Sequence, residues 1–307
     1  MKQDTVLIVV ATYNGEKFLR EQLDSLLSQS YENIAVEICD DGSSDETLAI
    51  AEEYCEKDKR FSLHRNETNQ GYVKNFLKAL QRSRASYMML CDQDDIWYND
   101  KVERTLDKMK QTERENANVP VLVYSDAMNY DSETRQKLGR FHATSHLNTK
   151  KVDTPHLFME NKCIGCTIMV NGKMRDYLHE LPEEIRVHDW WLALICSHFG
   201  RIEYLDEPTL LYRQHSGNMI GGEAYGGYVR ERVSHIKRQR GVLQRTYRQG
   251  AAFLKCFRQQ MTAEQIRIAE QFAGIERQGW FGRRIRLIAN GFYKSGFVRN
   301  VGLLLMM

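Results

Sequence analysis

The chain has 307 residues, 42% of them hydrophobic, and a formal net charge of +2, which predicts a globular protein with one large domain or two smaller ones. Its seven cysteines are odd in number and scattered, which argues against a disulfide framework and predicts reduced thiols in a cytoplasmic protein. The first ten residues do not resemble a signal peptide, and no apolar run reaches the roughly 18 residues that suggest a membrane span.

Strand and helix patterns alternate over the first 126 residues. Continuous apolar runs predict strands at 6–12, 34–39, 61–65, 87–91 and 121–125. Between them lie three predicted helices: one with Leu19, Leu23, Leu26 and Leu27 on one face, one from a capping-box pair at Ser43 and Glu46 to about Cys55, and one over 73–83. This alternation predicts an α/β fold with a doubly wound, mostly parallel sheet.

Polar groups follow four of these predicted strands, where ligands bind in such sheets. They are Thr12-Tyr13-Asn14, Asp40-Asp41, the run Asp92-Gln93-Asp94-Asp95, and Asp126. Clustered carboxylates repel unless a cation neutralises them or they take up protons, and hard cations such as Mg²⁺ and Mn²⁺ prefer oxygen ligands. We therefore expect a metal-bound phosphorylated ligand. The alternative is that the DQDD run only caps a helix starting near Trp97.

Two other features narrow the chemistry. No glycine-rich phosphate loop follows any predicted strand, which argues against a P-loop enzyme or a dinucleotide dehydrogenase. Cys163 and Cys166 form a C-x-x-C pair, but no second pair follows at zinc spacing, so we expect both in the core.

Several motifs together resemble the family 2 glycosyltransferases of the GT-A fold, in particular the bacterial rhamnosyltransferase-like branch that builds lipopolysaccharide and capsular glycans. In chain order they are ATYNGEKFLREQLDSLLSQSY, ICDDGSSDET, NQGYVKNF, CDQDDIW, GCTIMVN, VHDWWLAL and YRQHSGN, spread over the first 220 residues. The resemblance implies a nucleoside-diphosphate sugar donor and a divalent metal, Mn²⁺ or Mg²⁺.

The resemblance also implies roles for residues of the donor site. Thr12, Tyr13 and Asn14 would border the nucleotide, and Asp41, with Asp40 beside it, would contact base and ribose. Asp92-Gln93-Asp94 would be the metal- and donor-binding motif. Asp94 would be the first choice as direct ligand, and Asp95 would stand behind it or near the acceptor and diphosphate.

A carboxylate is also needed to remove the proton of the acceptor hydroxyl. The resemblance places it at Asp189, in VHDWW at the start of an apolar helix; the alternative is that Asp189 only caps that helix. The role of His188 stays open, and Trp190 and Trp191 either stack on sugar rings or lie in the core.

The run YRQHSGN, which we expect to be a polar loop, offers two further candidates. His215 is a possible third metal ligand and Arg213 a possible diphosphate contact. Nothing matches the Q-x-x-R-W motif of processive membrane synthases, which favours addition of single sugars.

The C-terminal part is basic. Residues 228–307 contain 16 Lys and Arg against 4 Asp and Glu, whereas the remainder contains 27 against 37. Residues 225–307 read as helices, one of them opened by the capping-box pair Thr262 and Gln265. Apolar residues alternate with cations near the end: Trp280, Phe281, Ile285, Leu287, Phe292 and Phe297. This pattern suits a helix lying on an anionic membrane; the alternative is a charged face whose apolar side packs on the catalytic body.

Together these patterns predict a catalytic domain over 1–222, with a nucleotide-sugar half to about 126 and an acceptor half from 127, and a basic amphipathic tail over 223–307. The predicted activity is inverting, metal-dependent transfer of a sugar, with rhamnose as a candidate, to a lipid-linked glycan at the inner face of the cytoplasmic membrane. A sugar-nucleotidyltransferase and a non-catalytic membrane scaffold are the alternatives. We expect no nucleic-acid partner, and oligomerisation is left open.

Overall fold

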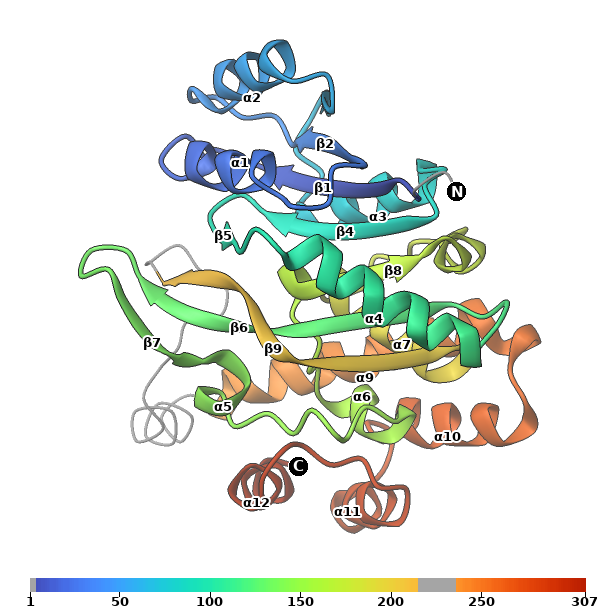
Figure 1. Cartoon of the computed structure of the whole chain (residues 1–307). Helices are drawn as coiled ribbons and strands as arrows, with labels where there is room; N and C mark the ends of the chain where they lie inside the picture. Colours follow the sequence, from blue (N-terminus) through green and yellow to red (C-terminus); the bar gives the residue numbers. More distant parts are fainter. Residues whose placement is uncertain (1–3, 215–235) are drawn as a thin grey trace.

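A computed structural model describes residues 4–214 and 236–307, which contain a nine-stranded sheet flanked by helices on both faces (Figure 1). The strands are β1 (Val6–Thr12), β2 (Ile34–Asp40), β3 (Phe61–Arg65), β4 (Tyr87–Asp92), β5 (Ile96–Trp97), β6 (Val121–Asp131), β7 (Gln136–Arg140), β8 (Ile168–Asn171) and β9 (Arg201–Gln214). The first six helices are α1 (Leu19–Leu27), α2 (Thr47–Lys57), α3 (Tyr72–Arg82), α4 (Lys101–Glu115), α5 (Phe141–Thr144) and α6 (Thr154–Met159). The later ones are α7 (His188–Phe199), α9 (Ile236–Phe257), α10 (Ala263–Ala273), α11 (Trp280–Ala289) and α12 (Phe297–Met306), with short 3₁₀ turns at Gly165–Thr167, Gly172–Tyr177 and Arg258–Gln260.

The sheet has a parallel half and a mixed half. Its strand order is β3-β2-β1-β4-β8-β6-β9-β5, with β7 paired to β6 outside this path. The neighbours β3, β2, β1 and β4 run parallel, as do β6 and β9, whereas β8 is antiparallel to both β4 and β6. The carboxyl ends of β1, β2 and β4 therefore meet at one edge, where their polar ends gather.

Two hydrophobic clusters cover the two faces of this sheet. In β4, Met88 and Leu90 belong to the cluster that includes α3, α7 and α9, whereas Tyr87, Met89 and Cys91 belong to the one that includes α1, α2 and α4. Because side chains alternate between faces and both faces are buried, the strand is apolar at every position.

The first four strands confirm the prediction from apolar runs, whereas the acceptor half departs from it. The strand predicted at 121–125 continues to Asp131, and β5, β7, β8 and β9 were not foreseen. The segment expected as a polar loop at Tyr212 instead begins inside β9, a fourteen-residue strand that pairs with β6 across register shifts.

Two predicted helix starts are wrong. α2 begins at Thr47 without a side-chain cap, because the Ser43 hydroxyl is engaged by Asp40 and Asn14. The helix after the DQDD run begins at Lys101, past the short strand β5, so those carboxylates do not cap it.

The C-terminal helices pack against the sheet domain and against one another. In α9, Phe253 packs edge-on against Trp191 of α7, with ring centroids 5.2 Å apart. The predicted capping box at Thr262 and Gln265 opens α10. The predicted domain boundary at 222–223 lies outside the described residues, and none of the described helices is both long and apolar enough to cross a bilayer.

Candidate active site

A cleft of about 1190 Å³ opens at the carboxyl ends of β1 and β4 and is bordered by α3, α7 and α9. Its lining includes predicted donor-site and catalytic residues: Thr12, Tyr13, Asp41, Asp92, Gln93, Asp94, His188, Asp189 and Trp190. Segments separated by nearly 100 residues in the sequence are thus brought to one cavity.

The two carboxylates after β2 hold the loops at the edge of the cleft. Asp40 is fully buried and accepts hydrogen bonds from the Thr12 hydroxyl at 3.0 Å and from the N–H of Ser43 at 2.9 Å. Asp41 accepts from the N–H groups of Gln70 and Gly71, at 2.9 and 2.8 Å, and lines the cleft. Of this pair, Asp41 is therefore the one within reach of a ligand.

The Gln93 side chain holds the loop after β1 through two hydrogen bonds to the backbone of Tyr13. Its Oε1 accepts from the N–H of Tyr13 at 2.9 Å and its Nε2 donates to the Tyr13 carbonyl at 3.2 Å. A Cβ at Gly15 would stand 2.2 Å from this Oε1, so a side chain there would displace the Gln93 amide from these hydrogen bonds. Asn14 accepts from the N–H of Ser44 and braces the neighbouring loop instead of lining the cleft.

The carboxylates after β4 lie in different environments. Asp92 and Asp94 line the cleft, and burial, the charge of Asp94 and the charge of Asp189 raise the pKa of Asp92 to about 7. Asp95 is fully buried; burial and its two acidic neighbours raise its pKa well above the usual range. Its Oδ1 accepts from the N–H of Arg213 at 3.2 Å, and it hydrogen-bonds to the Cys166 thiol.

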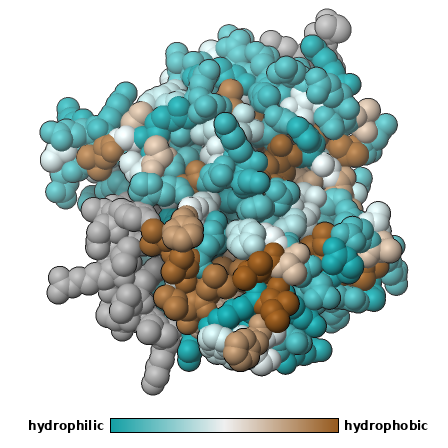
Figure 2. All heavy atoms as spheres, turned by 90° about the horizontal axis from the view of Figure 1, so that it is seen from below, coloured by the Kyte–Doolittle hydropathy of each residue, from teal (hydrophilic) through white to brown (hydrophobic). Residues whose placement is uncertain are grey.

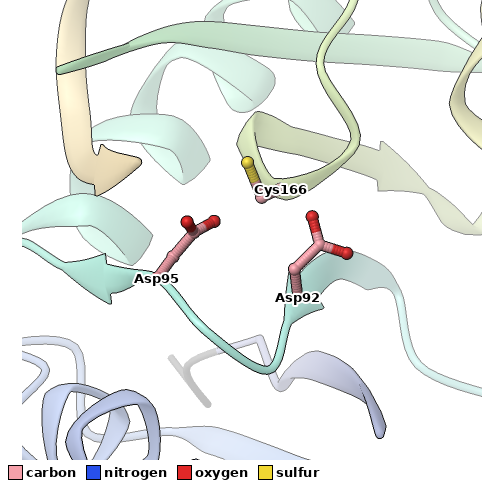
Figure 3. Close-up of side chains that lie close together, drawn as sticks. All are labelled: Asp92, Asp95 and Cys166. Atoms are coloured by element: carbon pink, nitrogen blue, oxygen red, sulfur yellow. The ribbon is translucent and has the colours of Figure 1, made fainter. Parts of the chain in front are cut away.

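Three potential metal ligands come within 4.8 Å of one another among the described residues: Asp92, Asp95 and Cys166 (Figure 3). The buried Cys166 has a raised pKa, so it stays a thiol, and it suits a hard cation poorly. Asp92 and Asp94 fit Mg²⁺ or Mn²⁺ better, because both are oxygen donors facing the cleft and their mutual repulsion is what a cation relieves.

Arg213 serves the loop that carries these carboxylates. Its Nε donates to the Asp94 carbonyl at 2.7 Å, its guanidinium pairs with Glu21, and it stacks over Phe18 at 4.6 Å. It is buried and is absent from the cleft lining, whereas His215 lies outside the described residues.

Asp189 enters the cleft from the first turn of α7. The N-cap position belongs to Val187, and the Oδ1 of Asp189 accepts from the N–H of Trp190 at 2.6 Å. The Asn161 side chain and the N–H of Gly165 also hydrogen-bond to this carboxylate. Burial nevertheless raises the pKa of Asp189 to about 7, which is where a general base is most effective.

The neighbours of Asp189 are held by packing. His188 is stacked on Phe76 with ring centroids 4.2 Å apart, and burial lowers its pKa to about 3, so it is neutral. Trp191 lies fully in the core, whereas Trp190 is buried in the same hydrophobic cluster and also lines the cleft, so sugar stacking stays a prediction for Trp190 alone. A Cβ at Gly165 would lie 2.8 Å from His188 Nε2, so this glycine lets the two segments meet.

One predicted member of the carboxylate edge belongs elsewhere. Asp126 lies inside β6 and accepts from Arg140 Nε at 2.7 Å and from the Tyr204 hydroxyl at 3.1 Å, and it contacts His142 Nδ1 at 2.8 Å. These partners hold the pKa of Asp126 well below its usual range, despite burial. Because β6 continues beyond Asp126, this carboxylate does not lie at a strand end. It is absent from the cleft lining and serves the structure.

Asn161, Gly165 and Cys166 were not singled out as site residues. The run GCTIMVN carried the signal for the last two, yet only the fold shows that it meets Asp95 and Asp189.

The sheet, with carboxylates at its strand ends and a cleft that a buried aspartate also lines, has the architecture of the GT-A fold. Residues 7–168 match the family Glycosyl transferase family 2, and the chain belongs to this family.

Two curated proteins of similar sequence are also named as glycosyltransferases or sugar transferases. The chain is 28% identical over 225 residues to a dTDP-rhamnosyl transferase, RfbG, of Shigella flexneri, covering 69% of this chain and 73% of that one. An uncharacterized glycosyltransferase of Haemophilus influenzae is 36% identical over 111 residues, covering 36% of this chain and 44% of its own length.

Solved structures share the fold. Staphylococcus aureus TarS 1–349, in complex with UDP-GlcNAc, has a TM-score of 0.58 at 17% identity, covering 93% of this chain and 73% of the 1–349 chain. The mannosyltransferase PcManGT of Pyrobaculum calidifontis, in complex with GDP-Man and Mn²⁺, has a TM-score of 0.55 at 16% identity, covering 99% and 79%.

Proposed function

We propose that the protein is an inverting, metal-dependent glycosyltransferase that extends a lipid-linked surface glycan, such as a lipopolysaccharide, O-antigen or capsule. The observation that carries the proposal is the shared cleft: Asp92 and Asp94 on one segment and the buried Asp189 on another, close enough for their charges to interact. Rhamnose, carried by a nucleoside diphosphate, is our candidate sugar, since one relative is named a dTDP-rhamnosyl transferase.

In this proposal Asp189 accepts the proton of the acceptor hydroxyl as that oxygen attacks the anomeric carbon of the donor. Asp92 and Asp94 would hold a divalent cation, which would supply positive charge against the departing diphosphate. Tyr13, Asp41 and Gln93 border the donor. Neutral His188, stacked on Phe76, fixes the first turn of α7 and so the direction of the Asp189 carboxylate.

A lipid-linked acceptor is supported by an apolar surface on α11 and α12. Of the eleven large hydrophobic side chains that are exposed in the described residues, eight lie on these two helices: Trp280, Phe281, Ile285, Ile288, Phe297, Val298, Val301 and Leu305. They form the membrane-docking face of this proposal, and apolar side chains gather on this side of the molecule in the view from below (Figure 2).

The charges around this face suit an anionic membrane. Residues 280–307 contain five Lys and Arg and no acidic residue, and the Arg284 guanidinium lies 3.6 Å above the Trp280 ring. Leu287 and Phe292 differ from the expectation for the tail, because both are buried in the core that joins α11 to the body.

The donor site is tested by calorimetry with a panel of sugar nucleotides and free nucleoside diphosphates, with and without Mn²⁺. We expect one nucleotide to bind only with metal, and Asp94→Asn to abolish that binding. Glu184→Gln, a matched loss of one charge at the cleft, should leave it unchanged. Binding of no nucleotide in either condition, or metal-independent binding that survives in Asp94→Asn, would contradict the proposal and favour the scaffold reading.

A further inference from the structure

The cleft also carries a group of cations that donor chemistry does not use. Arg186 precedes α7, and Arg245 and Arg248 lie one turn apart on α9; all three line the cavity that holds Asp92 and Asp189. Among the described residues, none of the three forms an ion pair.

Arg186 is held in place by its surroundings. Its Nη1 donates to the Thr246 hydroxyl at 2.6 Å, its backbone N–H donates to Gln249 Oε1 at 2.8 Å, and its guanidinium lies 4.8 Å above the Trp190 ring. These contacts use a small part of its hydrogen-bonding capacity, so a fixed and partly unsatisfied guanidinium faces the cleft three residues before Asp189.

This arrangement is electrostatically costly without an anion. Burial and the neighbouring charge of Arg245 together lower the pKa of Arg186 to about 10. Two acids lie nearby: Glu183 pairs with Lys74 at 2.6 Å, and Glu184 is an exposed residue of the cleft wall. A bound anion would relieve the repulsion between the guanidinium groups.

We propose that Arg186, Arg245 and Arg248 bind a phosphate or diphosphate group of the acceptor. Guanidinium groups match phosphate oxygens in pairs of hydrogen bonds. Arg186 lies on the same segment as Asp189, the proposed base, whereas the proposed site of the donor diphosphate is at Asp92 and Asp94. The inference rests on the proposed function and makes it more specific, since it gives the acceptor an anionic group close to the sugar that is extended.

The test is calorimetric titration of inorganic pyrophosphate into the full chain saturated with Mn²⁺ and the nucleoside diphosphate selected above. We expect pyrophosphate to bind beside the nucleotide, and Arg245→Gln or Arg248→Gln to weaken that binding about tenfold each. Arg240→Gln is the matched control, because this exposed arginine lies on the same helix and is absent from the cleft lining.

Each outcome is informative. Pyrophosphate binding at least tenfold tighter than inorganic phosphate assigns the site to the diphosphate of a lipid carrier, and equal binding assigns it to a single phosphate within the glycan. The inference is overturned if pyrophosphate displaces the nucleotide, if it does not bind, or if the arginine variants weaken nucleotide binding instead. Because nucleotide binding is measured separately, failure here is distinguishable from failure of the proposed donor site.

Discussion

Asp189 combines burial with only a few hydrogen-bond donors, and this combination sets the pH dependence of the reaction. Its pKa is raised from the usual Asp range to about 7, so the folded protein retains a proton in that interval which the unfolded chain has released. Ionising Asp189 therefore destabilises the fold as the pH rises through this window, while it creates the base of the proposed reaction.

We expect kcat/KM for the acceptor to fall about tenfold per pH unit below about pH 7, at saturating Mn²⁺ and donor. Asp189→Asn should lose this acid limb and about 10²- to 10⁴-fold in rate while it stays folded. Saturating metal keeps Asp92 ionised, so the limb reports Asp189. If the limb survives in Asp189→Asn, another group is the base.

Gly165 gives a second prediction, because a methyl group there would press on the catalytic segment. Its Cβ would lie 2.8 Å from His188 Nε2 and 3.6 Å from Asp189 Oδ2. Gly165→Ala should lower kcat at least tenfold with little change in donor affinity, since a small misplacement of a catalytic group is costly.

Gly241→Ala is the matched control, because nothing lies within 4 Å of its Cβ position. That change should leave kcat intact and stabilise α9 slightly. Equal kcat values for the Gly165→Ala and Gly241→Ala variants would show that His188 can move away from the added methyl group without disturbing catalysis.

These residues also show how much of the candidate site could be predicted from the sequence. Asp92 and Asp94 were predicted from their place after a buried strand, and Asp189 from the family resemblance; the structure brings all three to one cleft. Asp126 looked the same but is hydrogen-bonded to Arg140 and His142, partners that no spacing rule predicts. Gly165 was missed because the requirement for glycine comes from the approach of α7, which is a tertiary contact.

At the scale of elements, the junction of α7 and α9 joins the C-terminal helices to the helix that carries Asp189, the proposed base. Trp191 is fully buried and packs against Phe253 and Phe257 of α9. Trp191→Ala should lower the free energy of unfolding by about 3–5 kcal/mol. Trp280→Ala removes the same side chain from a position 58% exposed and should change it by less than about 0.5 kcal/mol. Denaturant titration measures both, and similar losses would contradict the assignment of Trp191 to the core.

The sequence predicted best those strands whose two faces are both buried along their length. β1 and β4 are covered on both faces and therefore read as continuous apolar runs. β9 carries Pro208 and several half-exposed polar residues and shifts register against β6, so its composition resembles a loop. Its strand character comes from pairing with a distant segment, which local pattern does not encode.

At the scale of the whole molecule, the catalytic cleft and the membrane-docking face are connected through one hydrophobic core. That core contains Trp190 and Trp191 of α7, Phe253 of α9, and Leu287 and Leu303 of α11 and α12. The proposed membrane-docking face is thus joined by this core to α7, the helix that carries the proposed base, Asp189. This connection would hold the cleft at a defined position relative to a lipid-linked acceptor.

The membrane-docking face gives the last prediction. Phe281 and Phe297 are 74% and 83% exposed, so replacing both by Asp removes apolar contact with a bilayer and adds charges that anionic lipid repels, without disturbing the core. In co-sedimentation with vesicles containing phosphatidylglycerol, we expect the wild type to bind, more weakly as salt rises, and the double variant to lose at least tenfold in partitioning. Leu138→Asp, an equally apolar residue 51% exposed on β7, should bind like the wild type. Binding of the double variant at the wild-type level, or no binding by the wild type, would mean that α11 and α12 present this face to something other than a membrane.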